Sequence, residues 1–181
     1  MSTGSTWWCE SAWLGGEVAE SCVVIEVADG RIAAVAAGVA EPPLGAGRLA
    51  GLTLPGLANA HSHAFHRALR GRTQAGTGSF WTWRDQMYGV AQRLDPDSCF
   101  RLARAVYAEM AMAGISVVGE FHYVHHQPDG TPYADPNAMG EALLAAAVEA
   151  RVRLTLLDTC YLYGGVAAGG YQTPGEHQRR F

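Results

Sequence analysis

Residues 52–63, LTLPGLANAHSH, decide the fold that this sequence predicts. The first nine residues form a short apolar segment that is interrupted by Pro-Gly, as expected of a buried strand that is entered through a turn. This strand runs directly into His61. Since side chains two apart in a strand face the same way, His61 and His63 can direct two imidazoles at one metal ion. A His-x-His pair also arises by chance, packed or exposed, so the pair alone leaves metal binding open.

Beyond this segment, helices alternate with short apolar strands. Asp95-Pro96 supplies an N-cap and a proline at the first helical position, and Asp135-Pro136 begins a second helix in the same way. The strands are expected at residues 52–60, 115–121 and 152–158. Strand, helix, strand, helix, strand in this order predicts parallel βαβ units.

Two fold classes, a doubly wound sheet and a (β/α)8 TIM barrel, share this alternation. A complete barrel takes about 250 residues in most examples. The roughly 130 residues that follow residue 51 have room for about four of its eight βα units. The length therefore predicts a truncated chain, in which residues 52–181 hold the first units of a larger fold.

The first 51 residues are expected to form a separate β segment. Residues 21–37 contain two β-prone runs joined by Ala28-Asp29-Gly30, where Asp-Gly supplies the positive φ angles of a tight hairpin turn. The stretch 41–51 is rich in proline and glycine, which indicates a connector. We place a domain boundary between residues 51 and 52.

Composition and charge argue against several functions. Apolar residues make up 49% of the chain and charged residues 17%, which is typical of a globular protein. The net charge is -4 and the thirteen Lys and Arg are scattered, so we expect no nucleic-acid partner. The amino terminus lacks a signal-peptide pattern and the longest apolar run is too short to span a bilayer, so we expect a cytoplasmic protein without a membrane partner.

The spacing of the cysteines and the absence of common catalytic motifs exclude further classes of function. The four cysteines lie far apart with no Cys-x-x-Cys pair, which indicates reduced thiols and no cysteine-based zinc site. Nucleobase deaminases of the His-x-Glu with Pro-Cys-x-x-Cys type need such a pair, and this deaminase class is set aside. The sequence contains no Gly-x-Gly-x-x-Gly, Walker or Gly-x-Ser-x-Gly motif, so dinucleotide, nucleotide and serine-hydrolase functions lack support.

Three blocks identify a family. They are LPGLANAHSHAFHRALRGR at 54–72, SFWTWRDQMY at 79–88 and GEFHYVHH at 119–126. With these blocks the chain resembles the formimidoylglutamate deiminases of the amidohydrolase superfamily, from about residue 52 to residue 163. The resemblance implies a β-sandwich-like domain followed by a metal-bearing (β/α)8 barrel of the amidohydrolase type. It also implies a catalytic zinc whose first two ligands are His61 and His63.

The same resemblance implies that Arg84 and Tyr123 contact the substrate, N-formimino-L-glutamate. Arginine presents a planar fork that binds a carboxylate bidentately, and this substrate carries two carboxylates. The ordinary alternatives are a surface cation beside Asp85 and a half-buried core tyrosine. Where the family often has a substrate-holding glutamine, this chain has His66, which keeps donor and acceptor capacity in a shorter side chain.

A second group of histidines follows the strand expected at 115–121. His122, His125 and His126 admit a second metal centre as one interpretation. The ordinary interpretation is a solvated loop, or a hydrogen bond that supports a neighbouring group. The spacing does not decide between them.

The reaction implied by the resemblance is hydrolytic deimination. Metal-activated water attacks the formimino carbon, and the products are N-formyl-L-glutamate and ammonia. The remaining ligands, a histidine and an aspartate, and the acid-base residues are expected beyond Phe181, so we expect the isolated chain to be inactive. A homodimer is left open for the intact parent. The alternatives are another amidohydrolase, such as a guanine deaminase or a chlorohydrolase-like enzyme, and a non-catalytic half-barrel that serves as a binding module.

Overall fold

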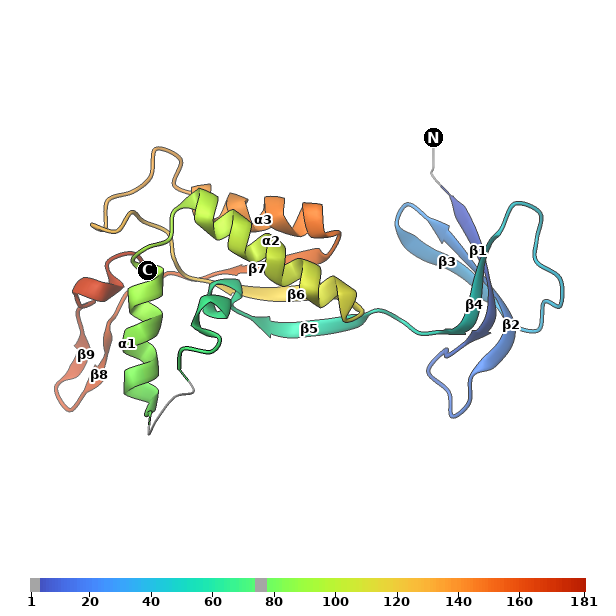
Figure 1. Cartoon of the computed structure of the whole chain (residues 1–181), viewed down its shortest axis with the longest axis horizontal. Helices are drawn as coiled ribbons and strands as arrows, with labels where there is room; N and C mark the ends of the chain where they lie inside the picture. The colour runs from blue at the N-terminus through green and yellow to red at the C-terminus, as the bar shows by residue number, and fades with distance from the viewer. Residues whose placement is uncertain (1–3, 74–77) are drawn as a thin grey trace. The chain divides into compact units, whose positions relative to one another are not determined.

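The computed structural model describes residues 4–73 and 78–181, and the chain divides into two compact units, one up to Pro55 and one from Gly56. The first unit is a four-stranded sheet in the order β3-β2-β1-β4 (Figure 1). Strands β1, β2 and β3 are antiparallel neighbours, whereas β4 lies parallel to β1. The strands are β1 (Ser5–Ala12), β2 (Glu20–Ala28), β3 (Arg31–Ala36) and β4 (Gly47–Thr53).

The hairpin between β2 and β3 turns where the sequence predicts it. Asp29 and Gly30 have φ angles of 51° and 72°. A two-residue turn of type I′ requires positive φ at both central positions, which explains why Asp-Gly occupies them. The predicted hairpin is confirmed.

The connector expected at 41–51 is wrong in its second half, because β4 occupies residues 47–53. Leu49 of β4 packs against the small core of this unit. One apolar residue among glycines gives too weak an alternation to reveal a strand. The strand expected at 52–60 is therefore divided: its first two residues end β4, and β5 begins only after Pro55, which has no N–H to donate to a sheet.

The second unit contains a parallel sheet in the order β5-β6-β7, with two helices side by side on one face (Figure 1). The elements are β5 (Leu57–Ser62), α2 (Pro96–Met112), β6 (Ile115–His122), α3 (Ala138–Ala150) and β7 (Arg153–Asp158). Helices α2 and α3 form the crossovers that parallel strands need. The predicted alternation of strands and helices is confirmed.

The two helices begin differently. The Asp95 side chain accepts a hydrogen bond from the Ser98 N–H at 2.7 Å, so it caps α2 as expected. The Asp135 side chain instead accepts from the N–H of Asn137 at 2.9 Å and forms a turn before α3. Helix α3 therefore begins two residues later than the sequence predicts.

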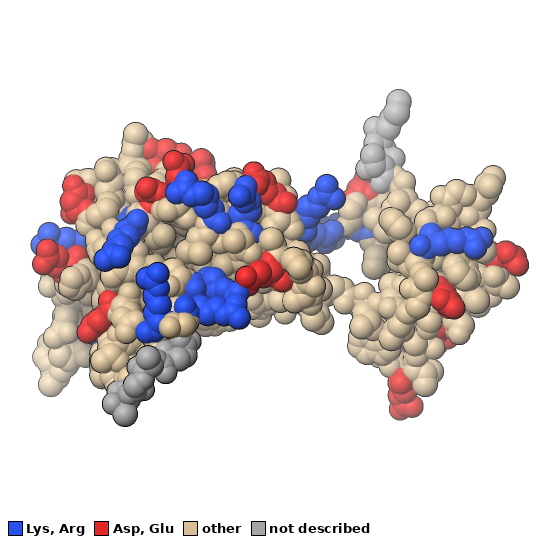
Figure 2. Space-filling view, in the orientation of Figure 1, with Lys and Arg blue, Asp and Glu red and all other residues tan. Residues whose placement is uncertain are grey.

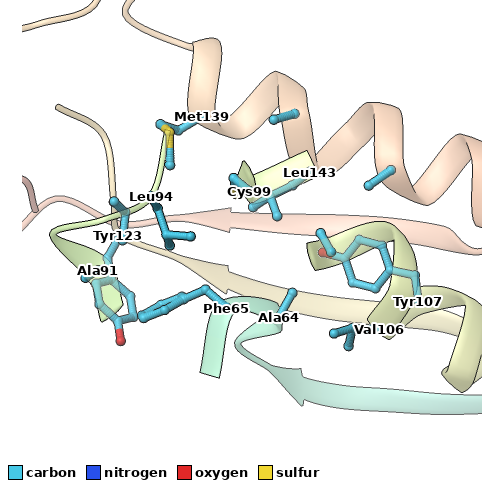
Figure 3. Packing of buried hydrophobic residues seen from close by; sticks show 14 of the residues in the cluster. Ala64, Phe65, Ala91, Leu94, Cys99, Val106, Tyr107, Tyr123, Met139 and Leu143 are labelled. Atoms are coloured by element: carbon cyan, nitrogen blue, oxygen red, sulfur yellow. The ribbon is translucent and has the colours of Figure 1, made fainter. Parts of the chain in front are cut away.

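The core of the second unit lies between the sheet and helices α2 and α3 (Figure 3). The buried residues of α2 are Cys99, Ala103, Val106 and Tyr107. Their spacing of four, three and one residues places them on one helix face. Val118 of β6 and Leu143 of α3 belong to the same cluster. This face of the sheet is therefore apolar and packed, and polar groups on it need buried partners.

Several short elements that the sequence analysis did not predict complete this unit. They are the 3-10 helices η1 (Ala64–Leu69) and η2 (Glu176–Gln178), helix α1 (Phe80–Ala91) and the hairpin β8 (Gly165–Ala167) with β9 (Gly170–Gln172). No helix within the described residues is long and apolar enough to cross a membrane. On the face drawn in Figure 2, arginine and acidic side chains are interspersed.

The cap of α2 can be tested by Asp95→Ala, which removes the acceptor for the Ser98 N–H. We expect the free energy of unfolding to fall by about 1 kcal/mol. The matched control is Asp97→Ala, which keeps the cap and changes only a first-turn charge, with an expected loss of at most about 0.5 kcal/mol. Urea denaturation of the 181-residue chain, followed by circular dichroism, measures both. Equal losses in the two variants would show that the cap contributes nothing special.

Candidate metal and substrate site

The two histidines of the HSH motif converge at the carboxyl end of β5. Nε2 of His61 lies 3.1 Å from Nε2 of His63. Nδ1 of His63 lies 3.1 Å from the Phe121 carbonyl oxygen. Since a carbonyl can only accept, Nδ1 carries the hydrogen and Nε2 presents a lone pair. Two ligands on one tetrahedral zinc lie about 3.4 Å apart, so the pair fits two positions on a single ion.

Glu120 of β6, to which the sequence analysis assigned no role, supports the motif from the helix-covered face of the sheet. Its side chain is 2% exposed and accepts a hydrogen bond from the Ala64 N–H at 2.6 Å. Ser62 is also buried, and its side chain forms a hydrogen bond with the Glu120 carboxylate. Burial raises the pKa of Glu120, and the contacts with Ser62 and Ala64 oppose that rise. Glu120 thus fixes the turn that directly follows His63.

All five residues that the sequence analysis singled out for metal or substrate line one pocket of about 310 Å³. They are His61, His63, His66, Arg84 and Tyr123. Apart from Met87, the remaining lining residues are aromatic. The pocket therefore combines two ligand-type nitrogens, a cation and a hydroxyl within an apolar wall, which is typical of a small-molecule site.

His66 and Tyr123 are hydrogen-bonded to each other, with 2.9 Å between the imidazole Nε2 and the hydroxyl oxygen. Burial, together with the nearby His63 and His61, lowers the pKa of His66 to about 4, so its ring is neutral at pH 7. Tyr123 is 4% exposed and its ring is part of the core, while its hydroxyl reaches His66 in the pocket. Tyr123 therefore packs in the core and also lines the pocket.

Arg84 reaches the pocket from α1. Its guanidinium lies 4.4 Å from the centre of the Trp81 ring and 5.6 Å from that of Tyr88. These aromatic faces attract the cation and hold its plane. Across residues 4–73 and 78–181, Arg84 forms no ion pair with Asp85 or any other carboxylate, and its buried Nε has no hydrogen-bond acceptor. The positive charge of Arg84 is therefore not paired with a carboxylate among the described residues.

Arg180 supports the wall of the pocket and was missed by the sequence analysis. It is fully buried, and its guanidinium donates to the carbonyl oxygens of Ala91, Leu94 and His126. The neighbouring Phe181 lines the pocket. No local signal could have found this role, because arginine is normally exposed and the segment has no periodicity.

The second histidine group lies apart from the pocket lining. His122 and His125 gather with Asp158, and one ligand-type atom from each lies within 4.8 Å of the others. His126 does not join them. No other cluster of three or more such residues occurs in the part of the chain that the structure describes. In that part, therefore, His61 and His63 do not form such a cluster with a third residue, although the ring of His66 stacks on that of His63 at 4.5 Å.

Solved structures share this fold. An amidohydrolase from Brucella melitensis aligns with a TM-score of 0.87 and 37% identity, over 98% of this chain and 39% of that one. The atrazine chlorohydrolase TrzN from Arthrobacter aurescens TC1, solved in complex with zinc, aligns with a TM-score of 0.71 over 93% of this chain and 39% of that one. At 19% identity, the second likeness shows the fold alone. The predicted fold class, an incomplete (β/α)8 barrel of the amidohydrolase type, is confirmed.

The chain belongs to the amidohydrolase family, whose model matches residues 52–162. It is also 46% identical over 140 residues to formimidoylglutamate deiminase from Pseudomonas aeruginosa, which confirms the resemblance seen in the three sequence blocks. That alignment covers 76% of this chain and 30% of the relative. The chain thus spans about a third of the length of these relatives.

The support from Glu120 can be tested by truncation. Glu120→Ala leaves the buried Ala64 N–H without an acceptor and opens a cavity, so we expect the free energy of unfolding to fall by about 3 kcal/mol. Zinc affinity at the histidine pair should fall about tenfold or more, because the turn after the motif loosens. Glu120→Gln keeps an acceptor oxygen and should lose less than about 1 kcal/mol. Denaturant titration and zinc titration measure the two effects, and identical behaviour of Ala and Gln would refute the role.

Proposed function

We propose that the enzyme to which this chain contributes deiminates N-formimino-L-glutamate to N-formyl-L-glutamate and ammonia, with one divalent metal ion, preferably zinc, held by His61 and His63. The observation that carries this proposal is the pocket in which the two convergent imidazoles share a wall with Arg84. The similarity to formimidoylglutamate deiminase from Pseudomonas aeruginosa supports the same substrate.

Different side chains of this pocket would contact different parts of the substrate. Arg84 offers its planar fork to one carboxylate of the substrate, and the rings of Trp81 and Tyr88 keep that fork in place. The neutral His66 and the Tyr123 hydroxyl add polar contacts without adding charge. His61 and His63 would hold a zinc ion, whose contribution would be to lower the pKa of water and so provide the nucleophile.

The two histidines do not by themselves complete a catalytic centre. A mononuclear zinc enzyme normally uses three protein ligands, and the departure of ammonia needs an acid-base group. Among the described residues, the ring nitrogens of His61 and His63 converge at this position, which would supply two of the three ligands. We therefore infer that a further histidine, an aspartate and the acid-base group come from the remainder of the enzyme, as the length of the relatives allows.

A second amidohydrolase activity is a candidate because the pocket wall is aromatic. Phe80, Trp83 and Tyr88 line it and can stack on a planar heterocycle. A heterocycle without a carboxylate, however, leaves the donor of Arg84 unused. The response of Arg84 variants to each substrate class therefore separates the two activities.

In the intact enzyme, Arg84→Lys should raise KM for N-formimino-L-glutamate at least tenfold, because an ammonium cannot bind a carboxylate bidentately. Arg93→Lys replaces an exposed arginine just beyond the same helix and serves as the control, with KM unchanged. Ammonia release measures turnover. If the unmodified enzyme releases none from this substrate but converts a heterocycle, and Arg84→Lys has no effect on that conversion, the deiminase proposal is wrong.

The 181-residue chain alone should bind zinc without turning the substrate over, since its pocket provides two ligands. Loading the purified chain with zinc and measuring ammonia release checks this expectation. The control is the intact enzyme at the same zinc concentration. Turnover by the isolated chain that is lost in His61→Ala would contradict the need for ligands from elsewhere.

A further inference from the structure

His122, His125 and Asp158 meet at the carboxyl ends of β6 and β7, on the face of the sheet opposite the pocket. Along β6, Val118 and Glu120 point to the helix-covered face, and both are buried. Side chains alternate along a strand, so His122 shares that face, whereas Phe121 lines the pocket with the HSH motif. The sheet therefore separates this cluster from the first pair of histidines.

The ring of His125 is oriented like that of a metal-binding histidine. Its Nε2 lies 2.8 Å from the carbonyl oxygen of Thr159, which can only accept, so the hydrogen is on Nε2. In the neutral ring, Nδ1 then presents a lone pair, and it faces Oδ1 of Asp158 at 3.6 Å. In a metal-bound imidazole, one ring nitrogen binds the metal, and the other usually donates its N–H to an acceptor such as a backbone carbonyl.

The distance between Nδ1 of His125 and Oδ1 of Asp158 distinguishes a hydrogen bond from a pair of metal ligands. At 3.6 Å it is too long for a hydrogen bond. Two ligands that each lie about 2.0–2.1 Å from a tetrahedral ion are about 3.4 Å apart. A cation between the two atoms would satisfy both acceptors. The alternative is an ion pair with protonated His125, which is weak because the Asp158 side chain is 61% exposed.

His122 supplies the independent observation. It is 5% exposed, and its Nε2 is buried without a hydrogen-bond partner among residues 4–73 and 78–181. A buried polar atom without a hydrogen-bond partner destabilises the fold unless something else binds it. Its ring packs edge-on against His125, with 5.0 Å between ring centres. His122 offers one ring nitrogen to this cluster, and a metal ion there would give the buried ring a polar partner.

The cluster is open to small ligands. His125 and Asp158 line a cavity of about 260 Å³ together with Asn137 and Glu141 from the start of α3. Three protein ligands beside an open cavity leave a coordination position for water or for another oxygen donor. Two imidazoles and one carboxylate form a donor set that suits zinc and related divalent transition ions rather than magnesium.

We propose that His122, His125 and Asp158 form a second divalent metal site, of the zinc type, separate from the His61 and His63 pair. This site does not depend on the proposed deiminase activity. It ties the loop after β6 to the end of β7, where the His122 carbonyl already accepts a hydrogen bond from the Thr159 N–H at 2.9 Å.

The experiment measures zinc binding in the 181-residue chain after the first pair is removed. The double variant His61→Ala, His63→Ala should retain one equivalent of zinc after desalting. Adding Asp158→Asn to this background should weaken zinc binding at least tenfold. The matched control adds His126→Ala instead, which removes a neighbouring histidine outside the cluster and should leave affinity unchanged.

Nitrogen-15 signals of the histidine rings provide a second readout. Zinc added to the His61→Ala, His63→Ala chain should shift the ring signals of His122 and His125, and circular dichroism confirms that each variant is folded. The proposal is overturned if the double variant retains no zinc, if these ring signals do not move, or if Asp158→Asn binds zinc as tightly as the His126→Ala control.

Discussion

The hydrogen bond from the Ala64 N–H to the buried Glu120 carboxylate determines where the two histidines of the motif point. A strand alternates its side chains, so His61 can face the pocket only if Ser62 faces the helices. Ser62 and Glu120 then meet in an otherwise apolar layer, where a carboxylate is tolerated only with partners. The same contact therefore stabilises the packed face of the sheet and orients the polar face.

Strand β6 uses both of its faces in this way. Phe121 contributes its carbonyl to the orientation of His63 and its ring to the pocket. Glu120 and His122, on either side of it in sequence, point into the helix-covered layer. Polar groups thus alternate with an aromatic one along three consecutive residues. That alternation explains why a block as short as GEFHYVHH carries so much of the chemistry of this unit.

The sequence predicted those features whose physical causes lie within a few residues of one another. Caps, Asp-Gly turns and apolar runs are local, and the convergence of His61 and His63 follows from the period of a single strand. Strand β4 was missed because Leu49 gains its partners from β1, far away in sequence. The role of Arg84 in substrate binding could be predicted only from the family resemblance, because its stacking on aromatic rings is visible only in three dimensions. Arg180 had no local signal, because its three acceptors come from distant segments.

Arg180 also has a consequence for the order in which this protein is made. Its guanidinium joins the end of α1 to the loop after β6, and its neighbour Phe181 lines the pocket. A ribosome synthesises His61 about 120 residues before it reaches that arginine, and domains fold as the chain emerges. The nascent chain can thus pair its strands early, while this part of the pocket wall is added later than His61 and His63.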